Sequence, residues 1–181
     1  LKECNRYDEA IIYYLKALKI TPDYPALHNN LGNAYRENGK PYEAIRSYEN
    51  ALASNPDLPE SHNNLGLLFF ELGQLDNALK SFKLAIKNRP SYDEAHNNLG
   101  SVFVTLNLLD EALKSFSMAI KISPDFDDAY NNIGNIFLAL NQTEDAIKSY
   151  KKTIDLNPDF AAPHNNLGNA FKELGQLDSA V

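Results

Sequence analysis

The sequence has few of the residues on which disulfide-linked, metal-binding or membrane-spanning chains depend. It contains one cysteine, Cys4, which excludes a disulfide framework and any C-x-x-C metal or redox motif. Its apolar runs are too short to cross a membrane. Lysine and arginine total 17 against 24 acidic residues, and the resulting net charge of −7 argues against nucleic-acid binding, which usually needs a basic face.

What the sequence does contain is one pattern with a period of 34 residues. A glycine recurs at that spacing, as Gly32, Gly66, Gly100, Gly134 and Gly168. A fixed period of this length is typical of a solenoid. Counting Pro25 as position 1, the complete repeats are 25–58, 59–92, 93–126 and 127–160, with partial repeats at 1–24 and 161–181. We predict a single solenoid over residues 1–181.

Each repeat is predicted to hold two helices, because apolar residues recur with helical spacing on either side of a turn. The first helices are expected at about 26–38, 60–72, 94–106, 128–140 and 162–174. The second helices are expected at about 7–20, 41–54, 75–88, 109–122 and 143–156, with 177–181 starting another. Only glycine or asparagine occupies the turn, which predicts a left-handed residue there. These residues are Asn5, Gly39, Gly73, Asn107, Asn141 and Gly175.

Position 8 is a glycine inside the first helix, where glycine costs about 1 kcal/mol relative to alanine. We attribute the presence of glycine at position 8 to close approach of the second helix of the pair. The second helices carry an aromatic residue at position 24, and a core role is favoured over a ligand cage for Tyr48, Phe82, Phe116 and Tyr150. Thr153 stands where other repeats have alanine, and the larger side chain is expected to loosen that contact by about 1–3 kcal/mol.

These small, aromatic and proline positions together resemble the tetratricopeptide repeat (TPR). The family's small residues fall on Gly32, Ala44 and Ala51, its aromatics on Tyr35 and Tyr48, and its proline on Pro56. The resemblance extends from end to end of the chain. It implies an all-α, right-handed solenoid of helix-turn-helix repeats, in which the first helices line a concave surface that binds proteins.

Positions 5 and 6 are asparagine in every complete repeat and in 161–181, although asparagine is a poor helix former. Position 5 is Asn29, Asn63, Asn97, Asn131 and Asn165, and position 6 is Asn30, Asn64, Asn98, Asn132 and Asn166. Because an amide both donates and accepts hydrogen bonds, a row of asparagines could bind the main chain of an extended peptide. The alternative is that the position-6 amides bond the neighbouring repeat.

The run HNNLGN, at His28–Asn33 and His164–Asn169, resembles the repeats attached to O-linked N-acetylglucosamine transferases. In that family an asparagine row grips the peptide main chain, and the positions that correspond are Asn30, Asn64, Asn98, Asn132 and Asn166. The resemblance gives an alternative hypothesis, in which the chain is the substrate-recognition arm of a glycosyltransferase. Nothing in this sequence resembles the catalytic domain of such an enzyme.

The expected groove is acidic and carries apolar side chains in its middle. The basic clamp by which some TPR proteins hold a carboxylate is missing, and position 2 supplies Glu60, Glu94 and Asp128 instead. Apolar residues in the middle of the groove are Leu67, Phe70, Val104 and Leu138. We therefore predict an extended, neutral or basic peptide with an apolar anchor, since an acidic groove repels acidic partners. Alternatively, the scattered carboxylates only solvate the surface.

Catalysis, metal binding and cofactor binding find no support in the sequence. The histidines at position 4 are His28, His62, His96 and His164, and packed helices about 8–10 Å apart would hold them too far from one another to share an ion. No phosphate-binding glycine loop is present. We expect a non-enzymatic cytoplasmic protein without cofactors.

The last repeat is partial, and its Leu167, Phe171 and Leu174 are expected to lack a covering helix. From this we expect either a longer array or ends that stack on another copy of the chain. Self-assembly is therefore a further hypothesis.

Overall fold

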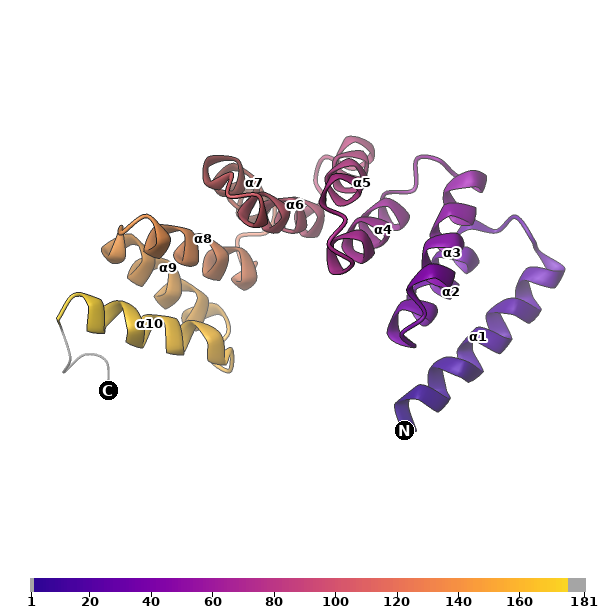
Figure 1. Cartoon of the computed structure of the whole chain (residues 1–181), viewed down its shortest axis with the longest axis horizontal. Helices are drawn as coiled ribbons and strands as arrows, with labels where there is room; N and C mark the ends of the chain where they lie inside the picture. Colours follow the sequence, from indigo (N-terminus) through magenta and orange to yellow (C-terminus); the bar gives the residue numbers. More distant parts are fainter. Residues whose placement is uncertain (1, 176–181) are drawn as a thin grey trace. The chain divides into compact units, whose positions relative to one another are not determined.

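The computed structural model describes residues 2–175, with side chains from Arg6 onward. The chain divides between Pro90 and Ser91 into two compact units, and the helices of each follow one another in antiparallel pairs (Figure 1). The first unit contains α1 (Lys2–Ile20), α2 (Pro25–Glu37), α3 (Pro41–Ser54), α4 (Pro59–Glu71) and α5 (Leu75–Asn88). The second contains α6 (Asp93–Thr105), α7 (Leu109–Ile122), α8 (Asp127–Ala139), α9 (Thr143–Leu156) and α10 (Ala161–Glu173).

The all-α fold of tandem helix-turn-helix repeats is confirmed. The four second helices from α3 to α9 have the predicted bounds, and the first helices begin and end one residue earlier than predicted. Within residues 2–175 no helix is both long enough and apolar enough to cross a bilayer.

The turn inside each repeat has the predicted left-handed residue. The backbone φ angle is +68° at Gly39, +72° at Gly73 and +70° at Gly175, and 58° at both Asn107 and Asn141. Asn5 is the exception, because α1 continues through it from Lys2 to Ile20 and the predicted helix end there is wrong. No proline or glycine interrupts residues 2–20. Asparagine is also tolerated inside a helix at less cost than glycine, so the helix can continue through this position.

Replacing Asn107 with alanine is expected to lower the free energy of unfolding by about 1 kcal/mol, because an alanine Cβ is strained at a φ of 58°. Replacement with glycine at the same site is expected to be neutral or slightly stabilising. Urea denaturation followed by circular dichroism compares the two. Equal stability of the alanine and glycine variants would show that the left-handed conformation is not what selects the residue here.

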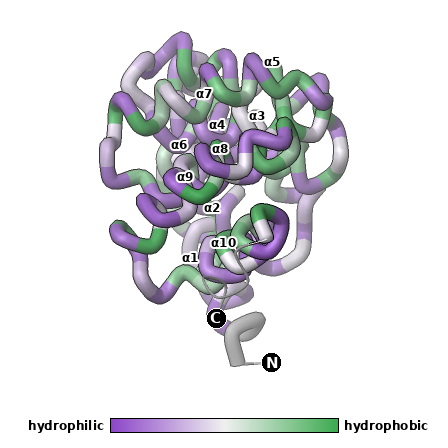
Figure 2. Tube along the Cα trace, turned by 90° about the vertical axis from the view of Figure 1, so that its left-hand side faces the viewer, coloured by the Kyte–Doolittle hydropathy of each residue, from purple (hydrophilic) through white to green (hydrophobic). Residues whose placement is uncertain are grey.

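The two helices of a repeat approach closely at the position-8 glycine. A Cβ built on Gly32 would lie 2.5 Å from the Tyr48 ring, and one on Gly100 would lie 2.6 Å from the Phe116 ring. The same contact recurs between Gly66 and Phe82 and between Gly134 and Tyr150. All four rings are fully buried, which confirms their core role. Hydrophobic and hydrophilic residues alternate along the trace in Figure 2, as expected for helices that bury one face and expose the other.

Thr153 is fully buried and its Oγ1 donates to the Ser149 carbonyl at 3.1 Å, so its hydroxyl is satisfied within α9. Whether Thr153 loosens the helix contact stays a prediction.

In α10, Leu167 and Phe171 are half-buried against α9 residues, and only Leu174, 40% exposed, is left largely open. α9 therefore covers one side of α10. Whether a partner helix covers the other side stays a prediction. The helix predicted at 177–181 lies outside the described residues.

Candidate functional site

The paired asparagines of the first helices bond one another from repeat to repeat. In the first unit, Asn64 on α4 donates from Nδ2 to Asn29 Oδ1 and to Asn33 Oδ1 on α2, both at 3.1 Å. In the second unit, Asn132 on α8 donates to Asn97 Oδ1 on α6 at 3.2 Å. The position-6 side chain thus donates to the position-5 side chain of the preceding repeat, which is the alternative interpretation considered from the sequence.

Asn166 on α10 follows the same rule and donates to Asn131 Oδ1 at 3.4 Å and to Asn135 Oδ1 at 3.0 Å. Asn33 and Asn135, both at position 9, are members of this network that sequence reasoning missed. Each also accepts a hydrogen bond from the buried tyrosine of its own repeat, from Tyr48 at 2.7 Å and from Tyr150 at 2.9 Å. A signal was available, because position 9 is asparagine in the complete repeats where position 24 is tyrosine.

Positions 5 and 6 differ in how much of the side chain reaches solvent. At position 5, Asn63 is 4% exposed and Asn131 is 8% exposed, while Asn29 and Asn97 are half-buried. Asn29 Oδ1 also accepts from Ser61 Oγ at 2.9 Å. Asn165 is exposed, but at the other position-5 residues this burial leaves little surface for a ligand. At position 6, Asn30 is exposed, and the half-buried members are Asn64, Asn98, Asn132 and Asn166.

The predicted acidic residues are not all available as free charges. Glu60 is paired with Arg89. Glu71 lies 3.7 Å from Arg36, whose guanidinium also contacts Glu37 at 3.1 Å. Glu94 and Asp128 are exposed overall. Partial desolvation of the Asp128 carboxyl, together with the negative charge of neighbouring Asp127, raises its pKa. The surplus of unpaired negative charge is therefore carried by Glu94 and Asp128 on the second unit rather than by Glu60.

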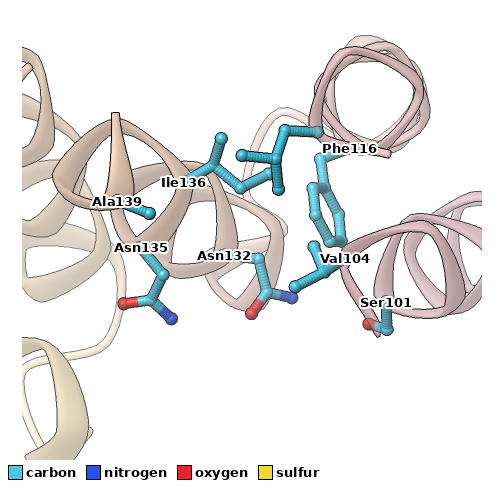
Figure 3. Close-up of a pocket in the computed structure, with 8 residues that line it drawn as sticks. Ser101, Val104, Phe116, Asn132, Asn135, Ile136 and Ala139 are labelled. Atoms are coloured by element: carbon cyan, nitrogen blue, oxygen red, sulfur yellow. The ribbon is translucent and has the colours of Figure 1, made fainter. Parts of the chain in front are cut away.

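Of the predicted apolar anchors, Leu67, Phe70 and Leu138 are half-buried and Val104 is 40% exposed. Val104 borders a pocket of about 170 Å³ between α6, α7 and α8. Its lining consists of Ser101, Val104, Leu109, Phe116, Asn132, Asn135, Ile136 and Ala139. In Figure 3 the Asn132, Asn135 and Ser101 side chains lie along one edge of the pocket, and Val104, Phe116 and Ile136 form its apolar part.

The position-4 histidines form hydrogen bonds to the turn between repeats. Nε2 of His28, His62 and His164 bonds the carbonyl of the proline six residues earlier, at 2.7, 2.8 and 2.9 Å. Tyr130 takes the same place in its repeat, with its hydroxyl 3.4 Å from the Pro124 carbonyl. Because a carbonyl can only accept, Nε2 carries the proton in these bonds and is not available as a metal ligand. The described residues form no cluster of three potential metal ligands.

Comparison with known proteins agrees with the repeat fold. The family model described as TPR repeat matches residues 1–39, 32–73, 66–107, 101–141 and 134–175. A crystal structure of MamA is similar with a TM-score of 0.75 and 27% identity over 83% of this chain and 88% of that one. YrrB, described as a TPR protein with an unusual peptide-binding site, has a TM-score of 0.70 and 26% identity over 90% and 84%.

The pilF protein of Pseudomonas aeruginosa has a TM-score of 0.88 over 97% of this chain and 80% of that one. Its identity of 19% makes this a likeness of fold alone. A search of the curated proteins found no match.

Proposed function

Because the chain belongs to the tetratricopeptide-repeat family, we propose that it is a non-catalytic protein-interaction scaffold whose position-6 asparagines bind the main chain of an extended peptide. The observation that carries this proposal is the direction of the amide bonds. Asn64, Asn132 and Asn166 all donate from Nδ2 to the preceding repeat. These bonds fix each amide plane and leave Oδ1 as the atom that can accept from a ligand N–H.

A fixed acceptor is favourable for binding, because the side chain loses little additional conformational freedom when the ligand arrives. A peptide main chain supplies one N–H per residue and can bond several such acceptors with little dependence on its sequence. The neighbour-bonded arrangement therefore orients the asparagine row for ligand binding. YrrB, described by its peptide-binding site, is a precedent among TPR proteins of similar structure.

The charge of the exposed residues favours a neutral or basic peptide. Glu94 and Asp128 are exposed carboxylates on the first helices of the second unit, and the whole chain has a net charge of −7. A basic peptide would associate faster with such a surface, and an acidic one would be repelled. Glu60 contributes less negative charge to this surface, since Arg89 pairs with it.

The proposal predicts different effects for two substitutions that break the same inter-repeat hydrogen bond. Asn132→Ala and Asn97→Ala both remove the bond of 3.2 Å between these side chains. Only Asn132→Ala also removes the Oδ1 offered to the ligand. We expect Asn132→Ala to weaken peptide binding by about 2- to 10-fold, the worth of one hydrogen bond of 0.5–1.5 kcal/mol.

The probe is a linear peptide selected on the full chain from a displayed random library, and its affinity is measured by calorimetry. Circular dichroism of both variants controls for folding. Asn97→Ala is the matched control and should cost less affinity than Asn132→Ala, because Asn132 then loses its fixed orientation but keeps the Oδ1 that accepts from the ligand. Equal affinity losses in the two variants would mean that the asparagine row is structural and does not bind the peptide.

A further inference from the structure

The pocket beside Asn132 is unlike the equivalent place in the first unit. There, position 9 is Asn33, which bonds both the Tyr48 hydroxyl and the Asn64 amide. The Arg36 guanidinium also lies 3.7 Å from Glu71 across the same two first helices. Polar and charged side chains therefore occupy that place.

In the second unit, the corresponding residues of the repeats 93–126 and 127–160 are smaller or apolar. Ser101 replaces the position-9 asparagine and turns its hydroxyl to the Asn97 carbonyl at 3.3 Å. Phe116 replaces the tyrosine and has no hydroxyl to satisfy. Ala139 stands where the first unit has Glu71, and Val104 where it has Arg36. These four differences leave a pocket with no ionisable side chain in its lining.

A second pocket shows the lining that forms where position 9 is asparagine and position 13 is glutamate. It lies between α1 and α2 and is lined by Tyr7, Ala10, Tyr14, Asn30, Asn33, Ala34 and Glu37. The carboxylate of Glu37 makes this second pocket less suited to an apolar group, because covering a charged group with an apolar one is unfavourable. The uncharged pocket between α6 and α8 is thus a local property of two particular repeats.

We propose that this pocket takes one apolar side chain of the peptide, of leucine to phenylalanine size, and so sets the register in which the peptide binds. The inference rests on the proposed function, because Asn132 borders the pocket and would hold the main chain beside the inserted side chain. A volume of about 170 Å³ suffices, since an apolar cavity of about 150 Å³ accommodates benzene. The uncharged lining favours a neutral side chain, while the exposed Glu94 and Asp128 favour basic residues elsewhere in the same peptide.

The test again uses linear peptides selected on the full chain from a displayed random library. The wild-type protein should select an apolar residue at one fixed position. Replacing that residue with alanine should weaken binding to the wild type by about 10- to 100-fold, as expected for burying one large apolar side chain.

Two variants fill the pocket with residues that the chain already uses at these positions. Ser101→Asn combined with Phe116→Tyr introduces the pair seen as Asn33 with Tyr48 and as Asn135 with Tyr150. Ala139→Glu introduces the carboxylate found at Glu37, Glu71 and Glu173, and Ala139 is exposed, so this variant should fold even if the other does not. Against either variant, the alanine peptide should bind within about threefold of the selected peptide, because the apolar contact is already lost.

If the alanine peptide loses as much affinity for both variants as for the wild type, while Asn132→Ala still weakens binding, the pocket inference is wrong and the proposed function stands. If no peptide binds, or Asn132→Ala has no more effect than Asn97→Ala, both are wrong. Self-association of the wild type that Ala139→Glu abolishes would identify a second copy of the chain as the occupant and overturn the inference.

Discussion

Gly100→Ala is expected to lower the free energy of unfolding by about 2 kcal/mol, although alanine is the better helix former. The new Cβ would lie 2.6, 2.8 and 2.9 Å from three carbon atoms of the Phe116 ring. Phe116 is fully buried, so the ring cannot move aside without disturbing its neighbours. Overpacking of this kind costs up to about 3 kcal/mol. The gain of about 1 kcal/mol in helix propensity offsets only part of it.

The effect of the glycine substitution should reverse when the ring is removed. Phe116→Ala alone is expected to cost about 3–5 kcal/mol, since it empties a fully buried site. In that background Gly100→Ala no longer meets the ring and should stabilise the protein by about 1 kcal/mol. The two substitutions lie in contact, so they are not expected to be additive.

The measurement is urea denaturation of the wild type, both single variants and the double variant, followed by circular dichroism. Ser117→Ala is the control, because Ser117 is exposed on the same helix as Phe116 and should change stability by at most about 0.5 kcal/mol. A Gly100→Ala effect of the same size and sign with and without Phe116 would contradict the explanation that ring contact selects the glycine.

This contact illustrates which parts of the fold the sequence makes predictable. A mid-helix glycine that recurs with an aromatic residue sixteen positions later has a local cause, and both residues can be read from the repeat. The same holds for the left-handed turn, which needs only the residue type at Gly39 or Asn107. Asn5 shows the limit, because asparagine can adopt the left-handed conformation but is also tolerated inside a helix, so the residue type alone does not decide between the two.

The asparagine network was less predictable, because it depends on contacts between repeats. The residue type at positions 5 and 6 shows that polar side chains recur, but not which one is buried or which atom donates. Burial separates Asn63 and Asn131 from the position-6 side chains only once neighbouring helices are placed. The pocket was harder still, since it arises from small residues at Ser101 and Ala139, and a small residue in one repeat carries no signal by itself.

Asn33→Leu is expected to lower the free energy of unfolding by about 1–3 kcal/mol, because it leaves a buried hydroxyl without its acceptor. The Tyr48 hydroxyl donates to Asn33 Oδ1 at 2.7 Å, and the tyrosine is fully buried. Adding Tyr48→Phe should restore most of the stability, since Leu67 and Phe82 already occupy the same two positions in the next repeat. Asn64 would keep its bond to Asn29, as Asn132 keeps one to Asn97. Chemical denaturation of the single and double variants measures both effects. No recovery in the double variant would show that the loss comes from the shape of the leucine.

The same pair predicts how stability depends on alkaline pH. Burial raises the pKa of the Tyr48 hydroxyl to about 12 from 10.0, although the Arg36 guanidinium opposes the shift. Since the pKa is higher in the folded protein than in the unfolded chain, this tyrosine contributes stability that is complete below about pH 10 and is lost as the pH rises toward 12. The Asn33→Leu, Tyr48→Phe variant should therefore lose less stability than the wild type between these pH values. Burial also raises the pKa of Tyr150 to about 12, so part of the alkaline loss should remain in the variant. Thermal melts of both proteins across this range give the change of melting temperature with pH. If the melting temperatures of wild type and variant fall equally with pH, Tyr48 ionises as easily in the folded protein as in the unfolded chain.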